Sequence, residues 1–429
     1  MSAENKPFGK YALDLLRAGP FRRYIVGAAI SDTGTWMQVM AQGWVVSNLT
    51  NKAIVLGLIN LAAGLPTIAL TMYGGSLADR HDKRKILIAT QVVQIACAIA
   101  LGLLVMTQVI QIWHVAILAT VLGACIAFEM PAISALVPEL VAHIQIGAAI
   151  NMDRAVFHGS RFIGSSVAGL LVSAWGAASA FFANAVSFIA LIIAIGTLPP
   201  RKQGTKEEEE QRRSSMMDGL RYVRSDHVMV AMIALIALTT IFVFPIVSPV
   251  MLPLYVRNIL HLGPRELGWL MAMSATGAFS GALGLLTIAP AKRFQFMTGN
   301  AIGVAAGLMC MSLSTSFWLT APAMAMLAVG LSMNFGLANT IVQERAPSPL
   351  RGRISAVFGM SFFGLMPIAG ILVPGFSDLV GMRPALGVAA ILFAVGAFVI
   401  LRAAGRKACE ASATIIPEAT AAPEPVAVP

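Results

Sequence analysis

Residues 86–127 read ILIATQVVQIACAIALGLLVMTQVIQIWHVAILATVLGACIA and contain no Asp, Glu, Lys or Arg. At about 1.5 Å of rise per helical residue, this run is long enough for two membrane crossings of roughly 20 residues each. The loop before it, GGSLADRHDKRK at residues 74–85, is crowded with charge. A charged loop next to a long apolar run is the pattern of a chain that spans a membrane several times.

The composition of the whole chain agrees with this interpretation. Hydrophobic residues make up 57% of the 429 positions and charged residues only 12%, and the mean hydropathy is +0.79. A soluble domain is about 25% charged, so the composition excludes an ordinary soluble protein. The net charge of +10 does not indicate a nucleic-acid binder, because the basic residues stand in short clusters between apolar runs. The four cysteines lack CxxC spacing, so we expect small buried residues and no metal site.

Apolar runs between charge, Gly and Pro breaks predict an all-α membrane protein with twelve transmembrane helices. The predicted spans are 24–46, 53–77, 86–106, 113–137, 155–174, 177–197, 228–256, 267–289, 297–317, 320–342, 354–376 and 384–401.

The positions of the basic residues test this map. With a cytoplasmic N-terminus, 25 of the 30 Lys and Arg residues fall in inner segments, four fall in outer loops, and Arg161 falls inside a span. Such an excess on one side is the rule for cytoplasmic segments of membrane proteins. The count predicts an even number of spans and two cytoplasmic termini.

The chain divides near its middle. We expect a cytoplasmic N-terminal segment (1–23), a first six-helix bundle (24–197), a cytoplasmic linker (198–227), a second six-helix bundle (228–402) and a disordered cytoplasmic tail (403–429). The end of the linker has apolar residues spaced as on a short helix at the membrane surface. The tail is rich in Ala, Pro and Glu, a composition typical of disorder.

The two halves resemble each other in sequence. The letters AVF at 155–157 and AGLLV at 168–172 recur as AVF at 356–358 and AGILV at 369–373, at a constant offset of 201 residues. The offset superimposes the fifth predicted span on the eleventh, six spans later. It therefore predicts two pseudo-symmetric halves, related as parallel repeats about an axis along the membrane normal.

The charged loop at 74–85 resembles the signature of the major facilitator superfamily, Gly-x-Leu-Ala-Asp-Arg-x-Gly-Arg-Arg/Lys, and departs from it at Asp82, where that family usually has Gly. The resemblance implies the family's fold of two six-helix halves and a cytoplasmic gate motif. Its residues here are Gly75, Leu77, Asp79, Arg80, Lys83 and Arg84. The resemblance further implies that Asp79 sits against the start of span 11, near residues 352–354, and holds the outward-open state.

Shorter patterns are similar to the branch that contains the bacterial enterobactin exporter and macrolide efflux proteins. They are FRR at 21–23, GLRYV at 219–223 and LRGRI at 350–354. This resemblance implies export of a siderophore, drug or metabolite.

Three charges fall inside predicted spans: Asp32, Glu129 and Arg161. Each costs roughly 2.5–3.5 kcal/mol or more at the centre of a bilayer unless it faces water or a partner. Their depths are similar, and the resemblance implies that spans 1, 4 and 5 border a central cavity. We predict a proton-titrating cluster in which Arg161 adjusts the two carboxyl groups. The alternative is a buried structural salt bridge that packs the first half.

The second half has no charge deep in a span, and its candidate cavity residues are Asn334, Asn339, Met360 and Phe363. Met- and Phe-lined surfaces adapt to varied apolar ligands, which favours a sizeable amphiphilic or aromatic substrate. The alternative is that these side chains pack between helices or face lipid. Pro245, Pro249 and Pro253 are expected to kink span 7.

These observations together predict a multi-pass transporter of the bacterial cytoplasmic (inner) membrane. We expect export of a small amphiphilic molecule by alternating access, coupled to protons as an antiporter and carried out by a monomer in the lipid bilayer. The alternative is an importer or an uncoupled facilitator of a small metabolite. The chain contains neither His-Glu-x-x-His nor Gly-x-Ser-x-Gly, which argues against an enzyme, and it contains no P-loop for ATP. No cofactor and no nucleic-acid partner is predicted.

Overall fold

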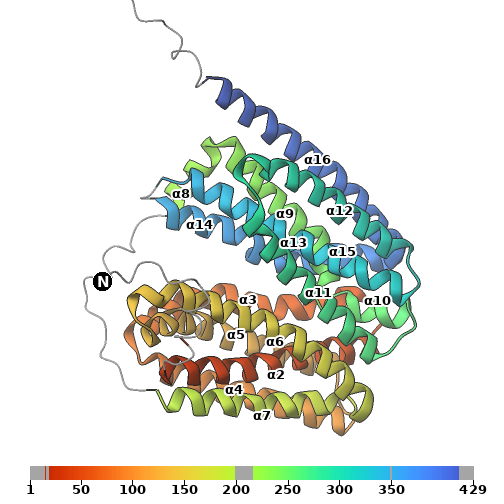
Figure 1. Ribbon diagram of the computed structural model, residues 1–429. Helices are drawn as coiled ribbons and strands as arrows, with labels where there is room; N and C mark the ends of the chain where they lie inside the picture. Colours follow the sequence, from red (N-terminus) through yellow and green to blue (C-terminus); the bar gives the residue numbers. More distant parts are fainter. Residues whose placement is uncertain (1–14, 16–18, 199–215, 348–349, 415–429) are drawn as a thin grey trace, which may run out of the picture.

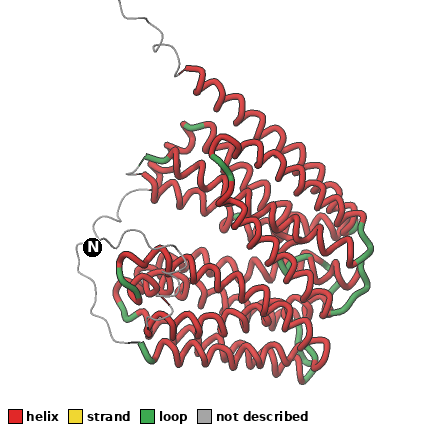
Figure 2. Tube along the Cα trace, viewed as in Figure 1, coloured by secondary structure: helices red, strands yellow, loops and turns green. Residues whose placement is uncertain are grey.

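A computed structural model describes residue 15 and residues 19–198, 216–347 and 350–414 of the chain, and the part that it describes is helical without strands (Figures 1 and 2). The first half holds α2 (Gly19–Leu49), α3 (Ala53–Arg80), α4 (Lys83–Met106), α5 (Ile112–Leu136), α6 (Ile146–Trp175) and α7 (Ala177–Gly196). The second half holds α9 (His227–Val247), α10 (Leu252–Asn258), α11 (Pro264–Gly284), α12 (Arg293–Leu313), α13 (Phe317–Arg345), α14 (Arg351–Gly359), α15 (Met366–Val380) and α16 (Met382–Thr414).

Eleven helical segments within the described ranges are long and apolar enough to cross a membrane. The remaining long helix, α2, has 31 residues and packs along α6 and α7. It is less apolar because it carries Arg22, Arg23 and Asp32 as well as the buried polar side chain of Gln38. With α2 included, the predicted twelve-helix architecture is confirmed, and its most polar span is the first.

The helices form two bundles, one above the other in Figure 1, and the ribbons diverge toward the side where the N-terminus lies. We call that membrane side, which holds Gly19, Arg80 and Leu198, the basic side, and we call the other the distal side. Between the halves, α3 packs on α15 and α6 packs on α11. These helices are spans 2 and 11 and spans 5 and 8, so moving six spans along the chain converts one pair into the other. The contacts between the halves therefore follow the predicted pseudo-symmetry.

Contacts across the distal side are made through glycines. A Cβ added to Gly57 on α3 would lie 1.7 Å from the carbonyl oxygen of Gly370 on α15. On α11, a Cβ added to Gly268 would lie 2.8 Å from the Cα of Gly169 on α6. Both distances are far inside van der Waals contact. The missing side chains therefore let the helices of the two halves touch backbone to backbone.

Two polar contacts join the halves at the same end. The Asp378 carboxylate, near the end of α15, accepts hydrogen bonds from the backbone N–H groups of Ala53 (2.7 Å) and Ile54 (2.9 Å), which begin α3. Arg257 at the end of α10 donates to the carbonyl of Ser47 and to the Asn51 side chain. A carboxylate at a helix N-terminus meets free N–H groups and the positive end of the helix dipole. The distal side is therefore closed.

Span 7 differs from its prediction as one helix over 228–256. The helix α9 ends at Val247, the chain turns through Ser248–Met251, and the short α10 follows. Pro249 lies in this break, where it lacks an N–H for a helical bond, and the Met251 N–H bonds instead to the carbonyl of Pro245 at 2.9 Å. Span 7 is thus broken at Pro249 rather than only kinked.

Span 11 is also interrupted, by a π-helical turn at Met360–Gly364 between α14 and α15. Pro367 follows this turn and cannot donate a backbone hydrogen bond to the preceding residues. Such bulges are a usual site of bending in long helices. This interruption lies on the span that packs against α3 through α15.

The connections on the basic side include one expected helix and one correction. The short helix expected near the end of the linker is α8 (Met216–Ser225). Asp226 follows it and caps α9 by accepting from the N–H groups of Val228 and Met229. The tail was expected to be disordered from residue 403, yet α16 continues to Thr414. Alanine is frequent in this stretch and has the highest helix propensity. Residues 415–429 lie outside the described part.

Candidate functional site

A polar network crosses the interior of the first half. Glu129 on α5 accepts hydrogen bonds from the side-chain amides of Gln91 (2.8 Å) and Gln94 (2.6 Å), which lie on one face of α4. The Gln91 carbonyl oxygen accepts in turn from the hydroxyl of Ser31 on α2 at 3.4 Å. Amide donors stabilise a carboxylate without bringing a compensating positive charge. Glu129 is therefore linked to two other helices, and its hydrogen-bond donors are uncharged.

Two further carboxyl groups lie within electrostatic range of this network. Asp32 follows Ser31 on α2, is half-buried, and interacts electrostatically with Glu129 and with Asp153 on α6. Asp153 accepts a hydrogen bond of 2.9 Å from the hydroxyl of Tyr24, whose side chain is buried. Three acidic groups from three helices thus share one region of the first half. We call Asp32, Glu129 and Asp153 the acidic cluster.

The structure brings two of the three predicted in-span charges together and separates the third. Asp32 and Glu129 belong to the acidic cluster, whereas Arg161 forms no ion pair with either within the described residues. Arg161 is eight residues beyond Asp153 on α6, or about 12 Å toward the distal side. The described contacts of Arg161 therefore support neither the expected adjustment of the carboxyl groups nor the alternative of a salt bridge among the three.

The sequence prediction missed Asp153 and its partner Tyr24. Span 5 was expected to begin at residue 155, so Asp153 counted as a loop residue, but α6 begins at Ile146. Asp153 therefore lies two turns inside the helix. The 129 residues between Tyr24 and Asp153 leave no local pattern from which the contact could be found.

Arg161 joins the two halves instead. Its Nη2 donates to the hydroxyl of Ser274 on α11 at 3.1 Å and to the carbonyl of Val247 at the end of α9 at 3.5 Å. The guanidinium also lies 4.9 Å from the ring centroid of Trp36 on α2, a cation–π distance. Trp36 in turn packs edge-on against Phe157 at 5.7 Å. Arg161 is therefore at the junction of both bundles, on the closed side of the acidic cluster.

Next to this junction lies a cavity of about 180 Å³ between α2, α3 and the break after α9. Its lining includes Val39, Gly43, Ile59, Asn60 and Pro249. Residues from both halves thus enclose it, and most of its wall is apolar.

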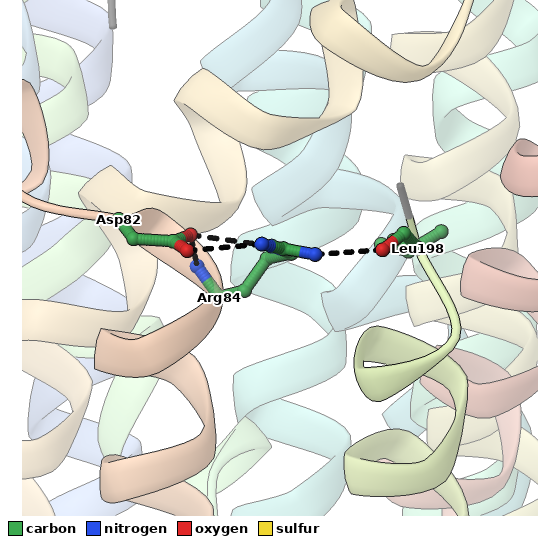
Figure 3. A network of polar contacts seen from close by, with 3 residues as sticks. All are labelled: Asp82, Arg84 and Leu198. Atoms are coloured by element: carbon green, nitrogen blue, oxygen red, sulfur yellow. Dashed lines mark hydrogen bonds and ion pairs between the residues drawn. The ribbon is translucent and has the colours of Figure 1, made fainter. Parts of the chain in front are cut away.

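The gate motif lies on the basic side, in the α3–α4 loop (Figure 3). Asp82 caps α4 and pairs with Arg84 at 3.0 Å, and Arg84 also donates to the carbonyl of Leu198 at the end of α7, at 2.6 Å. The hydrogen bond from Arg84 lowers the pKa of Asp82. Lys83 pairs with Glu139 at 3.1 Å. The departure from the family signature at Asp82 thus has a structural role, because this carboxylate orients Arg84.

The rest of the gate motif lies at the end of α3. Gly75 has open space where a Cβ would stand, and Leu77 and Arg80 are exposed. The side chain of Asp79 lies outside the described part of the structure. The described polar contacts of Asp82, Lys83 and Arg84 are all within the first half.

The four candidate cavity residues of the second half do not meet in one site. Asn334 is buried and bonded to Asn300 (2.7 Å) and Thr239 (3.3 Å), so it joins three helices. Asn339 lines a separate pocket of about 390 Å³ with Gln343, Glu344 and Arg351. Met360 and Phe363 lie on the π-helical turn, with 54% and 57% of their surface exposed.

Comparison with known proteins supports the assignment made from the charged loop. A family model described as "transmembrane secretion effector" (MFS_3) matches residues 11–428. The multidrug efflux pump Tap of Mycolicibacterium fortuitum is 23% identical over 86% of this chain and 91% of its own. Macrolide efflux protein A of Streptococcus pyogenes is 23% identical over 83% of this chain and 89% of its own. These relatives are named as transport proteins and not as enzymes.

Solved structures share the fold at low identity. The nucleoside transporter NupG superposes with a TM-score of 0.72 at 10% identity, covering 90% of this chain and 98% of that one. A bacterial homologue of the iron transporter ferroportin in an inward-facing state superposes with a TM-score of 0.66 at 17% identity, covering 90% of this chain and 99% of that one. The match to the MFS_3 family model over residues 11–428 confirms the predicted membership of the major facilitator superfamily. This multi-pass membrane protein belongs to the transmembrane secretion effector family, MFS_3.

Proposed function

We propose that this protein exports a small amphiphilic molecule by alternating access, with protons moving in the opposite direction. The observation that carries the proposal is the acidic cluster inside a bundle whose two halves are closed only on the distal side by the described contacts. The names of the relatives, a multidrug efflux pump and a macrolide efflux protein, support the outward direction. A siderophore, a drug or a metabolite fits the same description.

The distribution of charge supports the orientation. The basic side holds most of the Lys and Arg residues, and such sides of membrane proteins face the cytoplasm. On this assignment the protein lies in the bacterial inner membrane with both termini inside, and the closed distal side faces outward. The conformation described here is then the inward-facing one, in which substrate enters from the cytoplasm.

The acidic cluster has the properties that a proton site requires. A charged carboxyl group inside a membrane bundle is costly unless a cation or water compensates it. The described residues give Asp32 and Glu129 no ion pair, and an ionised Asp32 is repelled by ionised Glu129 and Asp153. Uptake of protons removes both costs. Gln91 and Gln94 donate hydrogen bonds that stabilise the ionised form of Glu129, so both its protonated and its ionised form are accessible.

In this proposal the gate motif holds the opposite state of the cycle, in which the halves are closed on the basic side. When the halves close on the basic side, the α3–α4 loop approaches the start of α14, and Asp79 meets free N–H groups there. Arg84 positions the loop through Asp82 and Leu198. The distal contact between Asp378 and the start of α3 is its counterpart in the opposite state.

Transport by purified protein in vesicles tests the coupling. Efflux of macrolides, siderophores and cationic dyes is measured with an imposed pH gradient, with and without a protonophore. We expect Asp32→Asn and Glu129→Gln to retain binding but to lose gradient-driven accumulation. Glu208→Gln is the matched control, because it removes a carboxylate of the predicted linker, outside the spans and outside the gate motif. Transport that ignores the gradient in the unmodified protein supports a facilitator, and gradient-driven transport that survives both substitutions overturns the coupling role.

A further inference from the structure

Four buried side-chain polar atoms in the described residues have no hydrogen-bond partner: Trp36 Nε1, His158 Nδ1, Arg161 Nε and Ser165 Oγ. Three of them belong to α6, at positions 158, 161 and 165, which share one face of a helix. The fourth belongs to Trp36, whose ring faces the Arg161 guanidinium. Buried polar atoms are almost always paired, so four orphans at one junction indicate a place for a missing partner.

We propose that this junction binds the polar group of the transported molecule, and that this group is an oxyanion such as a carboxylate or a phosphate. The inference rests on the proposed function and specifies the substrate class: an anionic amphiphile. We call Trp36, His158, Arg161 and Ser165 the anion subsite.

The chemistry of the unpaired atoms selects an acceptor. The Nε–H of arginine and the Nε1–H of tryptophan donate hydrogen bonds and cannot accept them, whereas a serine hydroxyl and a histidine Nδ1 can donate or accept. Arginine keeps its charge in proteins, and the polar contacts of Arg161 are with the neutral Ser274 and Val247. An anion gains two or more charge-assisted hydrogen bonds here. An organic cation would meet a like charge instead.

The neighbouring cavity accommodates the apolar part of such a molecule. Val39 and Gly43 line it one and two turns after Trp36 on the same face of α2, and Pro249 lines it two residues after the Val247 carbonyl that Arg161 contacts. Its volume of about 180 Å³ compares with the roughly 150 Å³ of an engineered cavity that binds benzene. One six-membered ring or a short alkyl chain therefore fits beside the anion subsite.

The position of the subsite links binding to the conformational cycle. Trp36 and Ser165 belong to the first half, whereas the Ser274 hydroxyl and the Val247 carbonyl belong to the second. A ligand on the free Nε–H of Arg161 touches the same guanidinium that joins the halves. A ligand stabilises one conformation over the other only if its contacts with the protein differ between the two conformations.

Equilibrium binding to the purified protein in a neutral detergent tests the inference. Radiolabelled 4-phenylbutyrate is the probe, and unlabelled 4-phenylbutyrate, 4-phenylbutanamide and 4-phenylbutylamine compete with it. The three compounds differ in the polar group, which is anionic, neutral or cationic. We expect the acid to compete at least tenfold better than the amide and the amine.

Substitutions locate the binding. Arg161→Gln is expected to lower the affinity for 4-phenylbutyrate at least tenfold, and Trp36→Phe, which keeps a ring and removes the N–H, is expected to lower it severalfold. Ser274→Ala is the control for a loosened junction, because it removes a partner of Arg161 and keeps the charge. Arg221→Gln is the control for net charge, because Arg221 is exposed on α8. Thermal unfolding shows that each variant is folded.

The inference is overturned if the unmodified protein does not bind 4-phenylbutyrate saturably, if the amide or amine binds as well as the acid, or if Ser274→Ala weakens binding as much as Arg161→Gln does. Binding in detergent needs no gradient and no direction of transport. A protein that binds the acid at Arg161 but fails the vesicle assay refutes the proposed coupled export alone, whereas one that transports only neutral or cationic compounds refutes the anion subsite alone.

Discussion

The contact between Asp378 and the start of α3 makes a quantitative prediction about the closed distal side. Replacing Asp378 by Ala removes the acceptor of two hydrogen bonds, from the N–H groups of Ala53 and Ile54. Loss of a helix N-cap costs about 0.5–2 kcal/mol. Asp378 is exposed, so water replaces part of the lost interaction and the lower half of this range applies. We expect about 1 kcal/mol, which changes the ratio of distal-closed to distal-open molecules about fivefold.

Distances between spin labels measure this ratio directly. The labels are placed on cysteines at Thr107 and Thr315, which are exposed on the distal side of the first and second halves. The four native cysteines are replaced first. The unmodified protein is expected to show mainly the shorter distance, and Asp378→Ala is expected to increase the longer one. Asp378→Asn keeps one acceptor oxygen and is expected to have a smaller effect.

A matched control separates closure from helix capping. Asp226 also caps a helix with its carboxylate, but its contacts lie within the second half. Asp226→Ala should therefore leave the distances between the distal labels unchanged. If Asp378→Ala changes the ratio less than twofold, or if Asp226→Ala changes it equally, the capping contact does not hold the halves together and the reasoning is refuted.

Two further predictions concern closure and pH. Gly57→Val places a side chain where even a Cβ would lie 1.7 Å from the Gly370 carbonyl oxygen, so we expect the short distance between the labels to vanish and transport to stop. The second concerns the pair of Asp226 and Arg345 on the basic side, at 2.8 Å. Burial raises the pKa of Asp226, but hydrogen bonds from Arg345 and from the first N–H groups of α9 outweigh it, and the pKa is lowered overall. The stabilisation is complete above the unfolded pKa of about 3.9 and is lost as the pH falls through the folded value. Asp226→Asn should therefore destabilise the protein at pH 6 and have little effect at the lowest pH, as thermal unfolding measures.

Each of these predictions has an outcome that contradicts it. Gly159→Val is the control for Gly57, because nothing lies within 4 Å of a Cβ at that position. If both glycine variants lose the short distance, bulk at Gly57 is not the cause. An Asp226→Asn variant whose stability differs from the unmodified protein equally at all pH values shows that the ionised carboxylate is not the stabilising species.

The sequence predicts the membrane architecture well, because charge and hydropathy act over short stretches of chain. The 201-residue offset and the basic loops are enough to divide the helices into two halves. The break after Val247 was not predicted, because the apolar run continues through residues 248–256 and hydropathy does not register a lost hydrogen bond at Pro249. The continuation of α16 past residue 403 was missed because an Ala-rich composition is compatible with both disorder and helix.

The candidate site was predicted only in part, for a different reason. Asp32, Glu129 and Arg161 stand out because charge is rare in spans, but their partners are set by helix packing. The bond from Arg161 to Ser274 joins residues 113 apart in the chain. Gln91 is uncharged and so gives no signal in a count of charges, although it orients Glu129. Rare charges thus locate a site, whereas tertiary contacts decide its chemistry.

The glycine contacts of the distal side have a consequence for how easily the protein changes state. Where Gly57 meets Gly370 and Gly268 meets Gly169, closing the halves brings backbone against backbone. Separating these glycine contacts exposes less apolar area than separating interlocked long side chains does. The two states can then remain close in free energy, within the few kcal/mol that one small ligand or one proton supplies. The close backbone contact that leaves no room for a side chain at Gly57 therefore also allows the two halves to separate again in each transport cycle.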